Sequence, residues 1–333
     1  MFVLQTSAGY FYALSSTGPT VRVPDFWTAD WDPGLNPLRG GLRYSLPESK
    51  HPDFSRTQSV GKPKKKSKAA KADKYLCYQK SVQSPEHEVE FFDVAFRDEF
   101  GRKPKTLRED FCGTFAVCCE WAKLGRERTA LGVDLDPEPI QWGEENNLSK
   151  LTSSQQKRVK VIQQDVRKRN RPRADVLAAQ NFSFWIFKTR EEVIEYFEVA
   201  RANMADQSIL VMDMMGGPAC LEEGHVDKRR IKKGKNGFRY FWEQARFNPV
   251  TSDCRFHISF KFNDGSKLKH AFTYEWRFWT IPEVREMLEE AGFSHSYVYF
   301  DVEDEDGEDT GEWARMEEYP SHSSWICYIV AVR

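Results

Sequence analysis

One stretch of the chain contains two carboxylates and a glycine with the spacing that is typical of a nucleoside-binding site. Glu109 follows a short predicted strand, and Gly113 lies next in the tight turn Cys112-Gly113-Thr114. Asp134 ends the following apolar run, roughly 20 residues after the turn, where a carboxylate can accept from both hydroxyls of a ribose. Because glycine lets backbone approach a ligand closely, the stretch predicts a site for a nucleoside-bearing ligand.

A strand, a turn, a helix and a second strand are the elements expected to position these residues. The helix is indicated by Val117, Trp121 and Leu124, which share one face at i, i+4 and i+7. Residues 130–133 form the short apolar run of the second strand. A dinucleotide is not expected, because the pattern G-x-G-x-x-G that admits a pyrophosphate is absent.

The sequence EDFCGTF, followed by GVDLDPEPI, resembles the first two motifs of class I S-adenosylmethionine-dependent methyltransferases. The first motif of this family usually has three glycines, and here Phe111 and Phe115 replace the outer two. The resemblance covers about residues 75–333. It implies a Rossmann-like fold, methyl transfer, and S-adenosyl-L-methionine as the cofactor, with Asp134 on the ribose.

Later strand ends supply the other contacts that the resemblance implies. Asp165 follows the predicted strand 159–164 and stands where the family often meets the adenine amino group. Asn181 follows the predicted strand 175–179 and faces the methionine part or the substrate, because such sheets bind ligands beyond their carboxyl ends. The predicted cofactor-binding residues are Glu109, Cys112, Gly113, Thr114, Asp134, Leu135, Asp165, Val166 and Asn181.

Residues 214–279 are predicted as an insertion, an antiparallel β meander with strands 238–247, 254–263 and 268–277. In class I methyltransferases, insertions at this place frequently recognise the substrate. Aromatic, amide and guanidinium groups suit a small polar acceptor, and aromatic faces attract a sulfonium. The alternative is that these side chains only cover the sheet. The predicted substrate-binding residues are Phe182, Trp185, Arg239, Tyr240, Gln244 and Arg277.

Near-continuous apolar strands alternate with helices, which indicates a parallel sheet that is buried on both faces. A helix over residues 75–100 precedes the first strand and, by the resemblance, covers the cofactor. Strands 296–300 and 325–332 follow each other without a helix between them, as an antiparallel pair does. The predicted fold is α/β, a doubly wound Rossmann-like seven-stranded, mostly parallel sheet with an antiparallel last strand and the inserted meander.

The composition is that of a globular protein, with 40% hydrophobic residues and a formal net charge of -1 over 333 residues. No apolar run approaches the roughly 18 residues of a membrane span, so no membrane partner is expected. Seven scattered cysteines without a C-x-x-C pair indicate reduced thiols and a cytoplasmic protein. No spacing typical of metal ligands occurs, so no metal is expected.

The first part of the chain is predicted to be an extension of the methyltransferase domain, which spans residues 75–333. Residues 1–74 are rich in serine, threonine, proline and glycine, and are expected to be irregular or partly disordered. They end in the basic run 62–74, which is a solvated linker or a patch for nuclear import or nucleic acid.

Methyl transfer from S-adenosyl-L-methionine to a small polar acceptor is the predicted function. Methylation of protein or RNA is an alternative, as is a non-catalytic binding module that keeps the fold. No His-Asp or Cys-His constellation stands out, so no catalytic residue is assigned, although His225, His257 and Tyr240 are candidate bases. The acceptor atom and the oligomeric state stay open.

Overall fold

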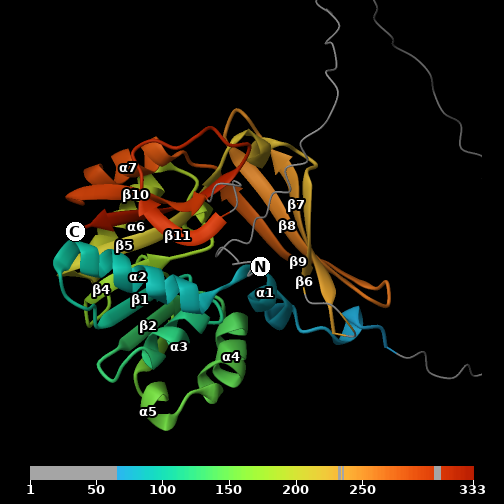
Figure 1. The fold of residues 1–333 in the computed structure, drawn as a ribbon, viewed down its shortest axis with the longest axis horizontal. Coiled ribbons are helices and arrows are strands. Elements are labelled where there is room, and N and C mark those ends of the chain that lie inside the picture. The colour runs from blue at the N-terminus through green and yellow to red at the C-terminus, as the bar shows by residue number, and fades with distance from the viewer. Residues whose placement is uncertain (1–65, 232–233, 235, 304–308) are drawn as a thin grey trace, which may run out of the picture. The chain divides into compact units, whose positions relative to one another are not determined.

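The computed structural model describes residues 66–231, 234, 236–303 and 309–333, which belong to one compact unit. Residues 1–65 of the predicted extension lie outside the described residues, so the domain boundary at residue 74 stays a prediction. The described residues form two sheets with helices around the larger one (Figure 1).

The larger sheet has eight strands in the order β11-β10-β12-β5-β4-β1-β2-β3. Its parallel strands are β1 (Thr106–Asp110), β2 (Thr129–Asp134), β3 (Val159–Gln163), β4 (Ala174–Ala179) and β5 (Met204–Gly216). β12 (Trp325–Val332) runs antiparallel to both β5 and β10 (His295–Glu303). The predicted doubly wound, mostly parallel sheet with an antiparallel last strand is confirmed.

The sheet has one strand more than the seven predicted. β11 (Asp309–Arg315) pairs antiparallel with β10 at the edge of the sheet. Its sequence, DTGEWAR, is mostly polar and lacks the apolar run that marks a buried strand. An edge strand with one neighbour needs no such run, which is why the pattern did not predict it.

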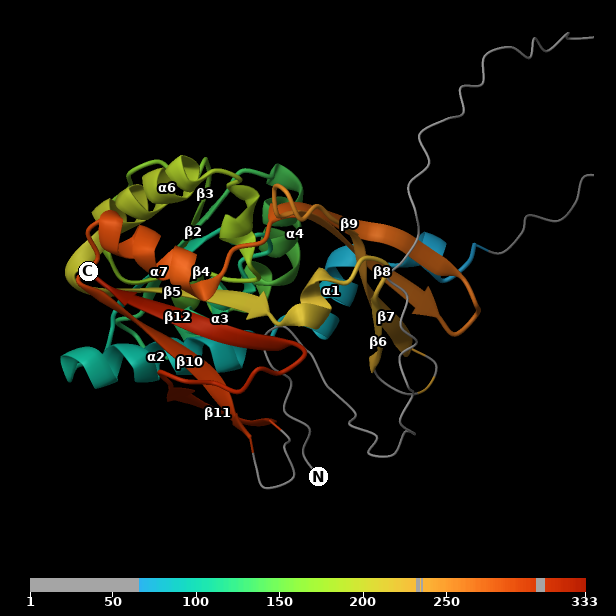
Figure 2. The same cartoon turned by 90° about the horizontal axis from the view of Figure 1, so that it is seen from above.

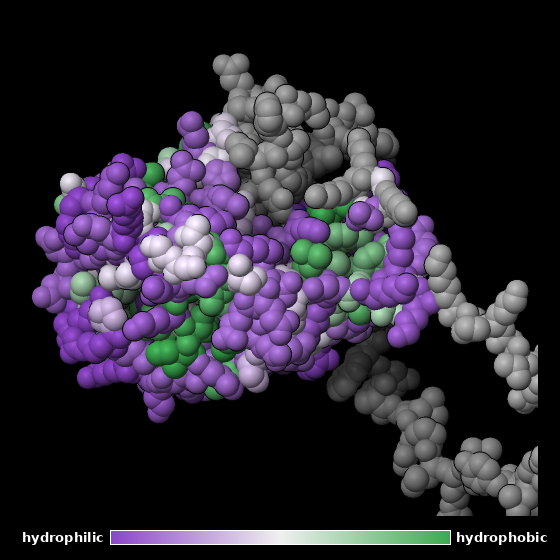
Figure 3. Space-filling view, turned by 90° about the horizontal axis from the view of Figure 1, so that it is seen from below, coloured by the Kyte–Doolittle hydropathy of each residue, from purple (hydrophilic) through white to green (hydrophobic). Residues whose placement is uncertain are grey.

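Helices cover both faces of the larger sheet (Figure 2). α2 and α3 contribute to one apolar cluster, and α6 and α7 contribute to the other. None of the described helices is long and apolar enough to cross a membrane, and the face in Figure 3 is mainly hydrophilic with separate apolar patches. The helices are α1 (Lys74–Val82), α2 (Pro85–Phe100), α3 (Ala116–Lys123), α4 (Pro137–Asn146), α5 (Ser153–Gln156), α6 (Arg190–Asn203) and α7 (Ile281–Glu290).

The helix predicted over residues 75–100 is two helices, α1 and α2. Pro85 begins α2 because a proline has no amide hydrogen to donate and fits the first helical position. The break turns the chain, so that α1 approaches the smaller sheet while α2 lies against the larger one. The described residues also form four short 3₁₀ turns: η1 (Ala69–Lys71), η2 (Leu148–Lys150), η3 (Ser183–Ile186) and η4 (Pro218–Leu221).

The predicted insertion contains the second sheet, which is antiparallel in the order β6-β7-β8-β9. Its strands are β6 (Val226–Ile231), β7 (Phe238–Phe247), β8 (Asp253–Phe262) and β9 (Lys267–Arg277). β6 was not among the three strands predicted for the insertion, and its residues are a strand because they pair in register with β7. Residues 232, 233 and 235 lie outside the described residues.

Candidate functional site

The turn after β1 and the carboxylate after β2 are joined by a direct hydrogen bond. The Gly113 amide donates to Asp134 Oδ2 at 2.7 Å, and the Asp136 amide donates to Oδ1 at 2.9 Å. Partial burial raises the pKa of the Asp134 carboxyl above its ordinary value. Each carboxylate oxygen has two lone pairs, so Asp134 can accept these amides and still accept from a ligand.

The two phenylalanines that replace glycines keep the backbone shape that glycine favours. Phe111 has φ +57° and Phe115 has φ +44°, both in the left-handed region. Such a residue costs roughly 1–2 kcal/mol, and burial of a phenylalanine offsets a cost of that size. Phe115 is fully buried beside Gly143, where an added Cβ would overlap its ring. The turn therefore retains its shape without the outer glycines.

The remaining predicted residues of the turn lie beneath it or beside it. Glu109 is buried, and its Oε2 accepts from the Cys118 amide in the first turn of α3 at 3.0 Å. Burial raises the pKa of Glu109 to about 7. Cys112 is also buried, and Thr114 Oγ1 accepts from Gln79 Nε2 of α1 at 2.9 Å. The structure thus brings α1 against the turn.

Three of the predicted cofactor-binding residues follow the neighbouring strands β2 and β3, and Asp165 is the one predicted to meet adenine. Leu135 is 68% exposed. Asp165 is paired with Arg167, whose Nη2 lies 2.9 Å from Oδ2, and this hydrogen bond lowers the pKa of the Asp165 carboxyl. Val166 is buried, and its carbonyl accepts from Arg108 Nη2 at 2.9 Å. A contact of Asp165 with adenine stays a prediction, and the carboxylate would share its charge with Arg167.

The loop after β4 is held by Asp213, an acid of β5 that the sequence analysis did not single out. Asn181 and Phe182 have left-handed backbone, and their amides donate to the two Asp213 oxygens at 2.9 Å each. Asp213 is fully buried, and burial raises its pKa to about 7. An acid inside the apolar run SILVMDMMG was the available signal.

A buried ion pair connects the elements that carry the site. Arg108 Nε donates to Asp110 Oδ1 at 2.7 Å, and the Tyr196 hydroxyl donates to Oδ2 at 3.2 Å. Arg108 also reaches Asn170 Oδ1 and the Val166 carbonyl. The pair therefore links β1, α6 and the loop after β3, and sequence patterns gave no sign of it.

No known protein-family model matches the sequence, and no curated protein matches it. Solved structures do match. The amino pentose methyltransferase CalS10 from Micromonospora echinaspora has a TM-score of 0.56 at 14% identity, covering 78% of this chain and 95% of that chain. An S-adenosylmethionine-dependent methyltransferase from Clostridium acetobutylicum has a TM-score of 0.56 at 13% identity, covering 78% and 96%. The sugar N-methyltransferase KedS8 from Streptoalloteichus has a TM-score of 0.53 at 16% identity, covering 85% and 99%.

The chain has the fold of S-adenosylmethionine-dependent methyltransferases. On this methyltransferase fold, the predicted cofactor residues lie on the turn after β1 and after β2, β3 and β4, at one edge of the sheet. That edge is where open α/β sheets bind ligands. Their contact with a cofactor stays a prediction.

The predicted substrate residues of the insertion divide between the two faces of its sheet. Tyr240 and Gln244 are buried on the inner face, where Arg229 lies over the Tyr240 ring at 4.5 Å. Arg239 alternates to the other face and is exposed. These residues therefore cannot all line one pocket in this arrangement of the methyltransferase fold.

The aromatic residues after β4 pack against the insertion. Phe182 and Trp185 are buried, and both make edge contacts with the Trp276 ring at 6.1 Å between centroids. Trp185 is fully buried, as an ordinary core residue is. Its Nε1 has no hydrogen-bond partner among the described residues, so a role in holding a ligand stays a prediction.

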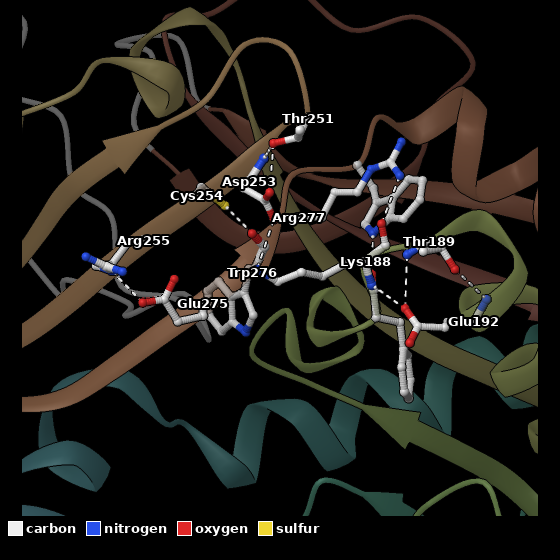
Figure 4. Close-up of polar contacts among 12 residues, drawn as sticks. Lys188, Thr189, Glu192, Thr251, Asp253, Cys254, Arg255, Glu275, Trp276 and Arg277 are labelled. Atoms are coloured by element: carbon white, nitrogen blue, oxygen red, sulfur yellow. Dashed lines mark hydrogen bonds and ion pairs between the residues drawn. The ribbon is translucent and has the colours of Figure 1, made fainter.

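Arg277 fastens the end of the insertion to the loop before α6 (Figure 4). Its Nη1 donates to the Lys188 carbonyl at 2.9 Å, and its guanidinium lies 3.9 Å from the centroid of the Trp279 ring. Lys188 Nζ forms an ion pair with Asp253 Oδ1 of β8 at 2.9 Å. These contacts give Arg277 a structural role beside the predicted contact with the substrate.

Arg277→Ala is expected to lower the free energy of unfolding by about 1–2 kcal/mol, because it removes a hydrogen bond and a cation–π contact. Urea unfolding measures the change. Arg255→Ala in the same sheet is the matched control. It removes a partly exposed ion pair with Glu275 and is expected to cost at most about 1 kcal/mol. Equal stability of Arg277→Ala and the parent would show that the fastening contributes nothing.

Three buried carboxyls make the stability of the ligand-free protein depend on pH. Burial raises the pKa of Glu88 to about 8 and those of Glu109 and Asp213 to about 7. Between pH 5 and 8 the folded chain therefore binds more protons than the unfolded chain, so its stability falls as the pH rises.

We expect the free energy of unfolding to fall between pH 5 and pH 8, by about 1.4 kcal/mol per pH unit for each carboxyl that is protonated only in the folded chain. Urea unfolding at a series of pH values measures it. Glu88→Gln should make the dependence shallower, because glutamine does not titrate. If the free energy of unfolding rose over this interval, burial would not raise the pKa values of these carboxyls.

Proposed function

We propose that this chain transfers a methyl group from S-adenosyl-L-methionine to a small polar acceptor. The observation that carries the proposal is the hydrogen bond between the Gly113 amide and Asp134 at the ligand edge of a methyltransferase fold. It would place an acceptor for the hydroxyls of a ribose beside a tight turn. The titles of the matching structures name small-molecule enzymes, an amino pentose methyltransferase and a sugar N-methyltransferase, which supports a small acceptor.

The charges around the turn suit the cofactor. Glu88, Glu109 and Asp213 are buried, and none has an ion-pair partner among the described residues. Buried charges are usually paired, so an excess of carboxyls favours a ligand that carries positive charge. When bound, S-adenosyl-L-methionine supplies an activated methyl group on a positively charged sulfur. Asp134 would hold its ribose, and the Cys112–Thr114 turn would approach its methionine part.

The residues of this chain have the task of positioning the acceptor and excluding water. Methyl transfer needs the nucleophile and the methyl carbon close together and in line, so positioning contributes much of the rate. Phe182 after β4 contacts Trp276 of β9, and Tyr78 of α1 contacts Phe272 of the same strand. Their apolar rings would keep water from the reacting groups.

Incubation with S-adenosylmethionine labelled in its methyl group tests the proposal. The full chain is offered a panel of polar metabolites, with Asp134→Ala as the inactive control. We expect label in a small acceptor. Label in RNA or protein would favour the alternative acceptors. Binding of the cofactor without transfer to any acceptor would favour the non-catalytic module.

A further inference from the structure

Glu88 is a buried carboxyl to which neither the fold nor the predicted cofactor site gives a role. It lies in α2, is 0% exposed, and neither side-chain oxygen has a hydrogen-bond partner among the described residues. Buried polar groups are almost always hydrogen-bonded, and one without a partner destabilises the folded chain. The Glu88 carboxyl therefore suits a ligand that supplies the missing hydrogen-bond donor.

The charged neighbours of Glu88 are other acids. Burial raises its pKa most, the charges of Glu109 and Asp213 raise it further, and the backbone of Ser84 lowers it. Those two acids already accept from backbone amides, so they do not need Glu88 as a partner. Glu88 also acts on Tyr78, whose hydroxyl interacts with that of Tyr274.

Among the described residues, no basic side chain forms an ion pair with Glu88, Glu109 or Asp213. On the inner face of the insertion, Arg229 donates to the Ser81 carbonyl and lies over the Tyr240 ring. No group of three metal ligands occurs among the described residues either. The missing partner is therefore a cation that the chain itself does not supply.

The chemistry around Glu88 fits an organic ammonium. A carboxylate forms a strong, charge-assisted hydrogen bond with an ammonium group. The rings of Tyr78, Tyr240 and Tyr274 come from α1, β7 and β9, and aromatic faces attract cations once water is removed. Unpartnered polar atoms continue the same inner face, since Trp242 Nε1 and Gln244 Oε1 are buried without a hydrogen bond among the described residues.

We propose that Glu88 binds an alkylammonium group in a buried site formed by α1, α2 and the inner face of the insertion. Two molecules could carry this group. One is the α-ammonium of the cofactor and the other is a primary amine that serves as the methyl acceptor. The choice between them rests on the proposed function, whereas the binding of an ammonium at Glu88 does not.

Glu88→Gln tests the proposal, because glutamine keeps the shape and removes the charge. Affinities are measured by thermal shift for two matched pairs of probes. The first pair is S-adenosylhomocysteine and its analogue without the amino group. The second pair is cyclohexylamine and cyclohexanol. Both are measured in the presence of the S-adenosylhomocysteine analogue that lacks the amino group. Glu86→Gln, an exposed acid of the same helix, is the control variant.

We expect Glu88→Gln to weaken at least one amine probe by roughly tenfold to 100-fold, and to leave the neutral member of that pair unchanged. Loss for S-adenosylhomocysteine assigns the site to the cofactor, and loss for cyclohexylamine assigns it to the acceptor. The ligand-free variant should melt at the same temperature as the parent or higher, since glutamine cannot ionise where no partner compensates the charge. A merely structural role would lower that temperature.

Unchanged affinity for both amine probes in Glu88→Gln would overturn the proposal. Glu88→Met is the second variant, because an apolar side chain of similar length should fold well at a site with no hydrogen-bond partner, and it carries the same expectation. If the parent bound no S-adenosylhomocysteine, the proposed function would fail. The cyclohexylamine pair, repeated without the analogue, would then still decide the role of Glu88.

Discussion

Asp134→Ala is expected to weaken the binding of S-adenosylmethionine by roughly 100-fold, which corresponds to two charge-assisted hydrogen bonds to a ribose. The same substitution leaves the Gly113 amide without its acceptor, so the turn loses the hydrogen bond that joins it to the end of β2. Both effects act in one direction. The ligand-induced rise in melting temperature, which depends on affinity by mass action, should nearly vanish.

Two further variants separate the causes of that loss. Asp134→Asn keeps an acceptor for the Gly113 amide but lacks the charge, so its affinity should lie between those of the parent and the alanine variant. Asp136→Ala removes the cap of α4 and costs about 1 kcal/mol of stability without touching the ribose acceptor. An equal loss of affinity in Asp136→Ala would show that local disorder, and not the ribose contact, explains the result.

Asp110→Ala is expected to lower the free energy of unfolding by about 3–5 kcal/mol, because it leaves Arg108 charged and buried without its partner. Arg108 is 2% exposed and Asp110 is 1% exposed, so water cannot replace the lost carboxylate. Urea unfolding measures the effect. The loop after β3 is held by Arg108, so cofactor affinity should fall as well.

The double variant Arg108→Met, Asp110→Leu tests whether the unpaired charge is the cause. Replacing both members of a buried pair by apolar residues is often close to neutral, so most of the lost stability should return. A double variant as unstable as Asp110→Ala would instead assign the loss to packing.

The sequence was informative wherever a local pattern is sufficient. The spacing of Glu109, Gly113 and Asp134 follows from one strand–turn–helix–strand unit, and the structure has that unit at β1, α3 and β2. Strand 238–247 was predicted with the bounds that β7 has. A capping box at Thr189 begins α6, and another at Thr280 begins α7. In each case neighbours in sequence determine the result.

The sequence was uninformative wherever distant elements decide. An acid such as Glu88 in an amphipathic helix normally indicates a solvated face, and only the packing of α2 on the sheet buries it. The basic strand β6 has no apolar face of its own, and its pairing with β7 makes it a strand. The replacement of glycine by Phe115 is understood only through Gly143 of α4, which leaves room for the ring.

A calorimetric titration of the full chain with S-adenosylhomocysteine, repeated with Asp134→Ala, tests the central claim most directly. We expect saturable binding of one molecule per chain to the parent and strongly weakened binding to the variant, while Asp136→Ala binds as the parent does. No saturable heat with the parent, or equal affinity in the parent and Asp134→Ala, would contradict it.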